Sequence, residues 1–111
     1  MRVANGNLPR VVVEGTTYKT SSDETAIRDY IHVCDAARAN VEVLKRQTAE
    51  QESGVFTLNI GTGKSTSVLE LIDTFSKTIG KQIAYDLQHD MPHDSFELVA
   101  DMYKSRKLIN F

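Results

Sequence analysis

The chain has 111 residues, of which 41% are apolar and 25% charged, so a disordered or low-complexity protein is excluded and one folded domain over residues 1–111 is expected. The net charge of −2 carries no basic excess, and no apolar run approaches the ~20 residues that cross a bilayer. Neither nucleic acid nor a membrane is therefore expected as a partner. The single cysteine, Cys34, excludes an internal disulfide and favours a cytoplasmic protein, and the length is too short for a complete two-domain enzyme.

The first half of the chain predicts two extended segments, a loop and a helix. Val11–Val13 is a β-branched run that is typical of a strand, and the polar residues 14–25 predict a functional loop. Residues 28–33 predict a second extended segment. Asp35 is expected to be the N-cap of a helix over residues 36–47, where apolar residues recur at helical spacing.

The second half predicts strands that alternate with helices. Apolar residues alternate over 55–60, which predicts a half-buried strand. The next helix has the clearest signals, because Ser67 and Glu70 form a capping box and Gly80 stands where a C-terminal cap falls. The remaining predicted elements are strands over 83–87 and 98–100 and a helix over 104–109 after an Asp101 cap. The order predicts an α/β (α+β) fold with a small mixed sheet and helices.

The segment Gly61–Thr66 contains Gly-Lys-Ser but does not satisfy a nucleotide-binding pattern. A phosphate-binding loop needs an earlier glycine, and Leu58 occupies that position. A dinucleotide fingerprint needs a third glycine, and Thr66 occupies that one. The segment therefore predicts a tight turn between elements, and no cofactor-binding residue is assigned to this chain.

The remaining polar residues predict neither a metal site nor a catalytic site. His89 and His93 have the spacing of zinc ligands on a helix, but Pro92 disfavours a helix there, so a solvated loop is expected. No serine lies in a G-x-S-x-G elbow. Cys34 lacks the surroundings of a nucleophile and is expected to be a small buried residue.

Arg28 and Tyr30 are the remaining candidates for a binding site. Two residues apart on an extended segment, they project to one face. Arginine supplies a fork of donors for phosphate oxygens, and tyrosine supplies a ring and a hydroxyl. From the residues alone, a solvated pair between Arg28 and Asp29 is the favoured alternative.

The order of residues around this pair resembles a known family. Residues 27–37 read I-R-D-Y-I-H-V-C-D-A-A, similar to the R-D-Y-I-H-V-x-D-x-A segment of UDP-glucose 4-epimerases, which are extended short-chain dehydrogenases. Three further segments resemble family segments in the same order: the glycine turn at 56–63, the helix start at 67–72 and A-D-x-x-K at 100–104. The resemblance implies the C-terminal lobe that closes over a sugar nucleotide, without the N-terminal Rossmann domain that binds NAD.

The resemblance also implies site residues. Arg28 would contact the diphosphate and Tyr30 the nucleotide. A later family motif, R-x-G-D-x-x-x-Y, falls on residues 91–98, where Asp94 is retained as a third substrate-binding residue but Met91 and Leu98 replace the arginine and the tyrosine. The implied ligand is a UDP-sugar, which this chain in isolation is expected to bind weakly.

The implied parent is an NAD-dependent UDP-sugar 4-epimerase, whereas this chain alone is expected to be inactive. It lacks the glycine-rich NAD turn and the Y-x-x-x-K pair in its family context, so NAD belongs to the intact enzyme and no catalytic residue is assigned here. The missing Rossmann domain is the implied partner, and a homodimer is left open. The alternative is a free-standing, non-catalytic module that binds a sugar nucleotide or a partner protein.

Overall fold

The computed structural model describes residues 1–17, 22–50, 54–55, 57–89, 94–109 and 111. Within it the chain divides into two compact units, each built from two segments that are distant in sequence. Unit 1 comprises Met1–Arg28 and Ser65–Leu98, and unit 2 comprises Asp29–Lys64 and Val99–Phe111. That these units together form one domain stays a prediction.

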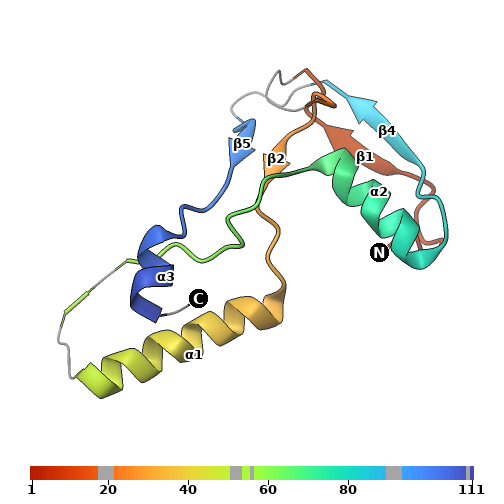
Figure 1. Ribbon diagram of the computed structural model, residues 1–111. Coiled ribbons are helices and arrows are strands. Elements are labelled where there is room, and N and C mark those ends of the chain that lie inside the picture. Colours follow the sequence, from red (N-terminus) through yellow and green to blue (C-terminus); the bar gives the residue numbers. More distant parts are fainter. Residues whose placement is uncertain (18–21, 51–53, 56, 90–93, 110) are drawn as a thin grey trace. The chain divides into compact units, whose positions relative to one another are not determined.

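Unit 1 contains two small sheets (Figure 1). Strand β1 (Val11–Glu14) pairs in parallel with β4 (Tyr85–Gln88). In the other sheet, β2 (Ile27–Arg28) is the central strand, antiparallel to β3 (Thr66–Ser67) and parallel to β5 (Glu97–Leu98). The three-stranded sheet is therefore mixed, and the predicted α/β class with a small mixed sheet is confirmed.

Helix α2 (Val68–Ile79) follows β3 and has the predicted ends. The Ser67 hydroxyl accepts a hydrogen bond from the Glu70 N–H at 3.1 Å, and the Glu70 carboxylate accepts one from the Ser67 N–H at 2.8 Å. Gly80 ends the helix at a left-handed φ of 64°, a conformation that glycine adopts without steric cost. None of the residues of α2 is buried, and Leu71 and Ile79 of its apolar stripe are 39% and 40% exposed.

Three strands begin or end at other residues than the sequence predicts. The strand predicted over 83–87 begins at Tyr85, because the N–H of buried Ile83 donates to the Ser76 hydroxyl, 3.1 Å away. The segment predicted over 28–33 is a strand only at β2. The strand predicted over 98–100 ends at β5, because the Ala100 N–H donates to the Asp29 side chain and not to a neighbouring strand.

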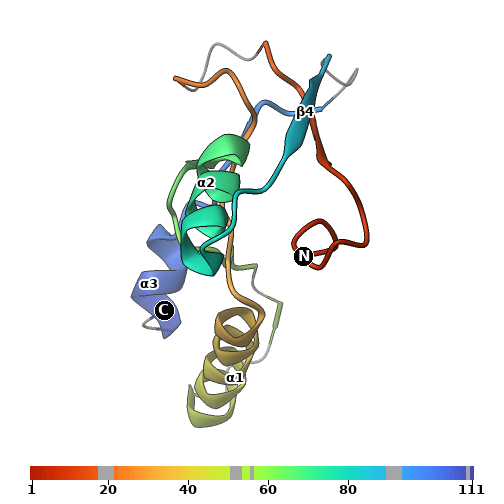
Figure 2. The same cartoon turned by 90° about the vertical axis from the view of Figure 1, so that its right-hand side faces the viewer.

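The described residues of unit 2 form two helices and an irregular segment. Helix α1 (Val33–Glu50) packs against α3 (Tyr103–Ile109), and the Arg46 guanidinium donates to the Leu108 carbonyl at 3.1 Å. Figure 2 shows these two helices after a quarter turn. Ala39 of α1 and Ile109 of α3 are buried. In the described part of the chain, no helix combines the length and apolarity that crossing a membrane requires.

The start of α1 differs from the prediction. The helix begins at Val33, before the predicted cap Asp35. The His32 carbonyl accepts hydrogen bonds from the N–H groups of Asp35 and Ala36, and its ring Nδ1 accepts one from the Cys34 N–H at 3.2 Å. His32 is therefore the N-cap residue of α1. Cys34 lies in the first turn and is exposed, so the prediction that it is buried is wrong.

The strand predicted over 55–60 is absent from the part of this segment that the structure describes. Residues 57–60 alternate between exposed and half-buried, as predicted, but pair with no strand. Their carbonyl groups accept from side chains: Thr57 from Lys104 Nζ at 2.8 Å, and Asn59 from the Ser105 hydroxyl. The alternating pattern indicates which side of the segment is covered, but it does not indicate whether a neighbouring strand pairs with it.

Candidate functional site

Two of the three predicted binding residues meet in unit 1. Arg28, at the end of β2, donates from Nη2 to Asp94 Oδ1 at 3.0 Å and from Nη1 to the Ile27 carbonyl at 2.8 Å. The Arg28 side chain is 24% exposed and that of Asp94 is 42% exposed. Because a guanidinium carries five N–H donors, these two bonds leave most of its donor capacity unused.

The other residues of the predicted site lie in different places. Tyr30 belongs to unit 2 and is 41% exposed. Leu98, where the resemblance expects a tyrosine, is the register partner of Arg28 on β5 and is 56% exposed. Adjacent register partners in a sheet project to the same face, so Leu98 stands beside Arg28. Met91 lies outside the described residues.

Asp29, which separates Arg28 from Tyr30 in the sequence, is held in unit 2 by four hydrogen bonds. Its Oδ1 accepts from the Thr62 N–H at 2.8 Å and from the Thr62 hydroxyl, and its Oδ2 accepts from the N–H groups of Gly63 at 2.9 Å and Ala100 at 3.2 Å. Burial raises the pKa of Asp29, but these hydrogen bonds together outweigh burial, so the pKa is lowered from its ordinary value.

These contacts correct the pairing that the residues alone favoured. Arg28 pairs with Asp94, and Asp29 pairs with backbone N–H groups, so the predicted solvated Arg28–Asp29 pair is wrong. The partners of Asp29 lie 33, 34 and 71 residues away in the chain. No local pattern could have identified them.

The same bonds account for the Gly61–Gly63 turn. A Cβ added to Gly61 would lie 2.7 Å from the Ala100 Cβ, so the position has no room for a side chain. Gly63 has a left-handed φ of 71°. The N–H groups of Thr62 and Gly63 point at the Asp29 carboxylate, which occupies the place that a phosphate takes in a phosphate-binding loop. The geometry is that of a tight turn, as predicted, and these N–H groups are already satisfied.

Asp29 therefore brings together three of the segments that carried the resemblance. The R-D-Y segment supplies the carboxylate, the glycine turn supplies Thr62 and Gly63, and the A-D segment before α3 supplies Ala100. The sequence alone indicated only a solvated pair of Asp29 with Arg28 and not this role. Its position between two candidate binding residues is the signal that could have indicated it.

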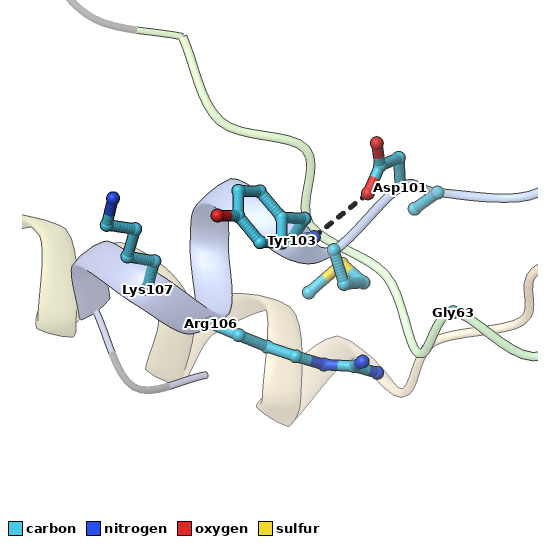
Figure 3. A pocket seen from close by; sticks show the side chains of 7 residues that line it. Gly63, Asp101, Tyr103, Arg106 and Lys107 are labelled. Atoms are coloured by element: carbon cyan, nitrogen blue, oxygen red, sulfur yellow. Dashed lines mark hydrogen bonds between the residues drawn. The ribbon is translucent and has the colours of Figure 1, made fainter.

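Unit 2 also contains an open hollow of about 530 Å³ beside α3. Figure 3 shows Arg106 reaching across it toward Gly63, while Lys107 points away. Asp101 Oδ1 accepts from the Tyr103 N–H at 2.9 Å at the start of α3, the position predicted for this cap. None of the three predicted binding residues lines this hollow.

The described residues contain no group of three or more His, Cys, Asp or Glu side chains that could hold a metal ion. His89 is exposed within this part of the chain. His93, the other residue of the considered zinc pair, lies outside it. The absence of a metal site therefore stays a prediction.

Comparison with known proteins gives close relatives, although no family model matches the chain. The chain is 41% identical over 106 residues to a bifunctional UDP-glucose 4-epimerase and UDP-xylose 4-epimerase from Pisum sativum. The matched residues are 96% of this chain and 30% of that protein. A crystal structure of a UDP-glucose 4-epimerase from Stenotrophomonas maltophila, with bound NAD and formylated UDP-arabinopyranose, matches with a TM-score of 0.91 at 37% identity. It covers 99% of this chain and 32% of that chain.

The UDP-glucose 4-epimerase of Bifidobacterium longum, in complex with NAD+ and UDP, matches with a TM-score of 0.87 at 38% identity and covers 99% of this chain and 32% of that one. The chain thus spans about a third of the length of the proteins it matches. The matching part is their C-terminal part. The chain is therefore a homologue of the UDP-glucose 4-epimerases that corresponds to their C-terminal part.

Proposed function

We propose that the chain is the substrate-binding lobe of a UDP-glucose 4-epimerase-like nucleotide-sugar epimerase that depends on NAD when intact. One observation carries the proposal. The resemblance assigns one ligand to two motifs far apart in the chain, and their residues come together in unit 1. Arg28 is ion-paired with Asp94 and is the register partner of Leu98.

The chemistry of these positions suits a sugar diphosphate. Arg28 can donate charge-assisted hydrogen bonds to phosphate oxygens, and its attachment to the Ile27 carbonyl holds the guanidinium at the end of β2. Leu98 supplies no hydroxyl beside it. With Leu98 here and Met91 in place of the second arginine, the chain keeps only part of the expected donor set, so we expect millimolar or weaker affinity for a UDP-sugar.

NAD belongs to the part of the enzyme that this chain does not cover. The Gly61–Gly63 turn does not suit its pyrophosphate, because the Asp29 carboxylate already occupies the N–H groups of Thr62 and Gly63. In the intact enzyme NAD would supply the hydride acceptor and donor for the sugar. The residues of this chain would bind and orient the nucleotide.

The test is a chemical-shift titration of UDP-galactose against the parent chain and Arg28→Ala. A charge-assisted hydrogen bond contributes roughly 1.5–3 kcal/mol, so the loss of Arg28 should weaken binding by about one to two decades, beyond detection. Arg10→Ala is the matched control, because Arg10 is also in unit 1 and also pairs with an exposed carboxylate, that of Asp86. We expect Arg10→Ala to bind like the parent.

A second variant in the same titration, Met91→Arg, tests the alignment of the later motif. Restoring an arginine at this position should strengthen UDP-galactose binding by about one decade. If Arg28→Ala binds as well as the parent, the phosphate role of Arg28 is wrong and the R-D-Y segment is only structural. If Met91→Arg gains nothing, residues 91–98 do not correspond to the family motif.

A further inference from the structure

We propose that Asp94 is a resident counter-anion, which occupies the Arg28 guanidinium until the phosphate of a ligand displaces it. The proposal deepens the proposed function and rests on it, because it concerns the same arginine. It assigns Asp94 a regulatory role in the free lobe. The ligand chemistry is that of a phosphate or diphosphate group.

The geometry places Asp94 in competition with a phosphate. Arg28 Nη1 is bound to the Ile27 carbonyl at 2.8 Å, and Nη2 is bound to Asp94 Oδ1 at 3.0 Å. A phosphate that binds a guanidinium through two parallel hydrogen bonds needs neighbouring N–H groups. Nη2 belongs to both pairs of neighbouring N–H groups of the guanidinium, Nη1 with Nη2 and Nε with Nη2. A phosphate that binds through either pair therefore competes with Asp94 at this nitrogen.

The Arg28–Asp94 pair is suited to exchange. The Asp94 side chain is 42% exposed, and among the described residues its one hydrogen bond comes from Arg28. A partly exposed ion pair is typically favoured over its open form by no more than about fivefold. At that limit the guanidinium is free about one-sixth of the time, and the apparent affinity for a phosphate falls to about one-sixth of its value for a free guanidinium. Once displaced, the Asp94 carboxylate is available to hydroxyl groups of the ligand.

Occupancy and simple charge repulsion make different predictions. If Asp94 acts by occupying Arg28, its removal multiplies the affinity of every ligand that needs this guanidinium by the same factor. If Asp94 acts only through its charge, the gain is larger for pyrophosphate than for phosphate, and removing another nearby negative charge reproduces it.

Glu97 supplies that second charge as a matched control. It lies on β5 as the register partner of Ile27, and successive side chains of a strand project to opposite faces. Glu97 therefore projects away from the face of Arg28, and it is exposed. Glu97→Gln changes the net charge as Asp94→Asn does and leaves the ion pair intact.

The experiment titrates inorganic phosphate and pyrophosphate against the parent, Asp94→Asn and Glu97→Gln, following backbone amide chemical shifts in every variant and the Arg28 Nε resonance wherever Arg28 is present. We expect Asp94→Asn to bind both anions up to about sixfold more tightly, by the same factor, and Glu97→Gln to match the parent. Adding Arg28→Ala should remove the gain. Asp94→Ser repeats the measurement should the asparagine variant fold poorly.

Several results would overturn the proposal. They are unchanged or weaker phosphate binding in Asp94→Asn, no response of Arg28 to either anion, and a gain that Glu97→Gln reproduces. The two proposals fail separately. If UDP-galactose binds no better than pyrophosphate, the nucleotide-sugar function is wrong while the competition at Arg28 still holds. If UDP-galactose depends on Arg28 but Asp94→Asn changes nothing, only the competition is wrong.

Discussion

Asp29 in unit 2 and Asp94 in unit 1 are both aspartates that bind other parts of the chain, but their surroundings differ. Asp29 accepts four hydrogen bonds, three of them from backbone N–H groups whose positions the fold fixes. Asp94 accepts one from a long side chain within the described part of the protein, and its side chain is 42% exposed. The number and rigidity of the donors separate a carboxylate that holds the fold together from one that a ligand can displace.

The largest expected effect is the loss of the Asp29 carboxylate. Asp29→Ala leaves three backbone donors without their acceptor, and we expect it to lower the free energy of unfolding by about 2–4 kcal/mol. Urea denaturation measures this change. Asp35→Ala is the control and should cost less than about 0.5 kcal/mol, because among the residues that the structure describes the Asp35 side chain pairs only with exposed Arg38 on α1. Equal effects of the two variants would contradict the structural role of Asp29.

The second effect tests the space around the same carboxylate. In Gly61→Ala the new methyl group meets the Asp29 side chain and the Ala100 Cβ, so the turn must shift, at a cost of about 1–3 kcal/mol. Gly80→Ala separates crowding from backbone strain, since Gly80 has a left-handed φ of 64° but open space around it. We expect it to cost about 1 kcal/mol or less in thermal unfolding. A Gly61→Ala variant as stable as the parent would show that the turn is loose.

The third effect is the pH dependence of what Asp29 contributes to the free energy of unfolding. The pKa of Asp29 is lowered in the folded chain, so its ionised form stabilises the fold above the unfolded pKa of roughly 4. This stabilisation is lost as the pH falls through the lower, folded pKa. The stability difference between the parent and Asp29→Asn should therefore narrow below about pH 4. Urea midpoints at descending pH measure it, and a constant difference would mean that the charge contributes nothing.

The smallest expected effect on stability is the loss of the Asp94 carboxylate. Asp94→Ala removes one partly exposed ion pair, which typically contributes less than about 1 kcal/mol to stability. The same urea titration used for Asp29→Ala gives the value. A loss as large as that of Asp29→Ala would show that Asp94 is part of the structural framework and not an exchangeable partner.

Local signals predicted the elements that local interactions form. Helix α2 has its capping box at Ser67 and Glu70 and its glycine at position 80, all within one turn of the helix ends. Strand β1 follows from its β-branched run. These features depend on residues a few positions apart, which the sequence displays directly.

Long-range partners were not predictable in the same way. The alternation over 57–60 correctly indicated one covered side, but the carbonyl groups of Thr57 and Asn59 bond to side chains 47 and 46 residues later. The resemblance implies both Arg28 and Asp94 as site residues, yet the ion pair between them spans 66 residues and no local pattern predicts it. Periodicity describes one segment at a time, whereas the site depends on which segments meet.

The division into two units determines the order in which they are completed as the chain is synthesised. Unit 1 is completed by residues 65–98 and unit 2 by residues 99–111, so neither unit corresponds to one continuous stretch of the chain. Asp29 and the N–H groups of Thr62 and Gly63 leave the ribosome well before Ala100, the last donor to the carboxylate. Unit 2 therefore acquires most of its residues early but is the last to close.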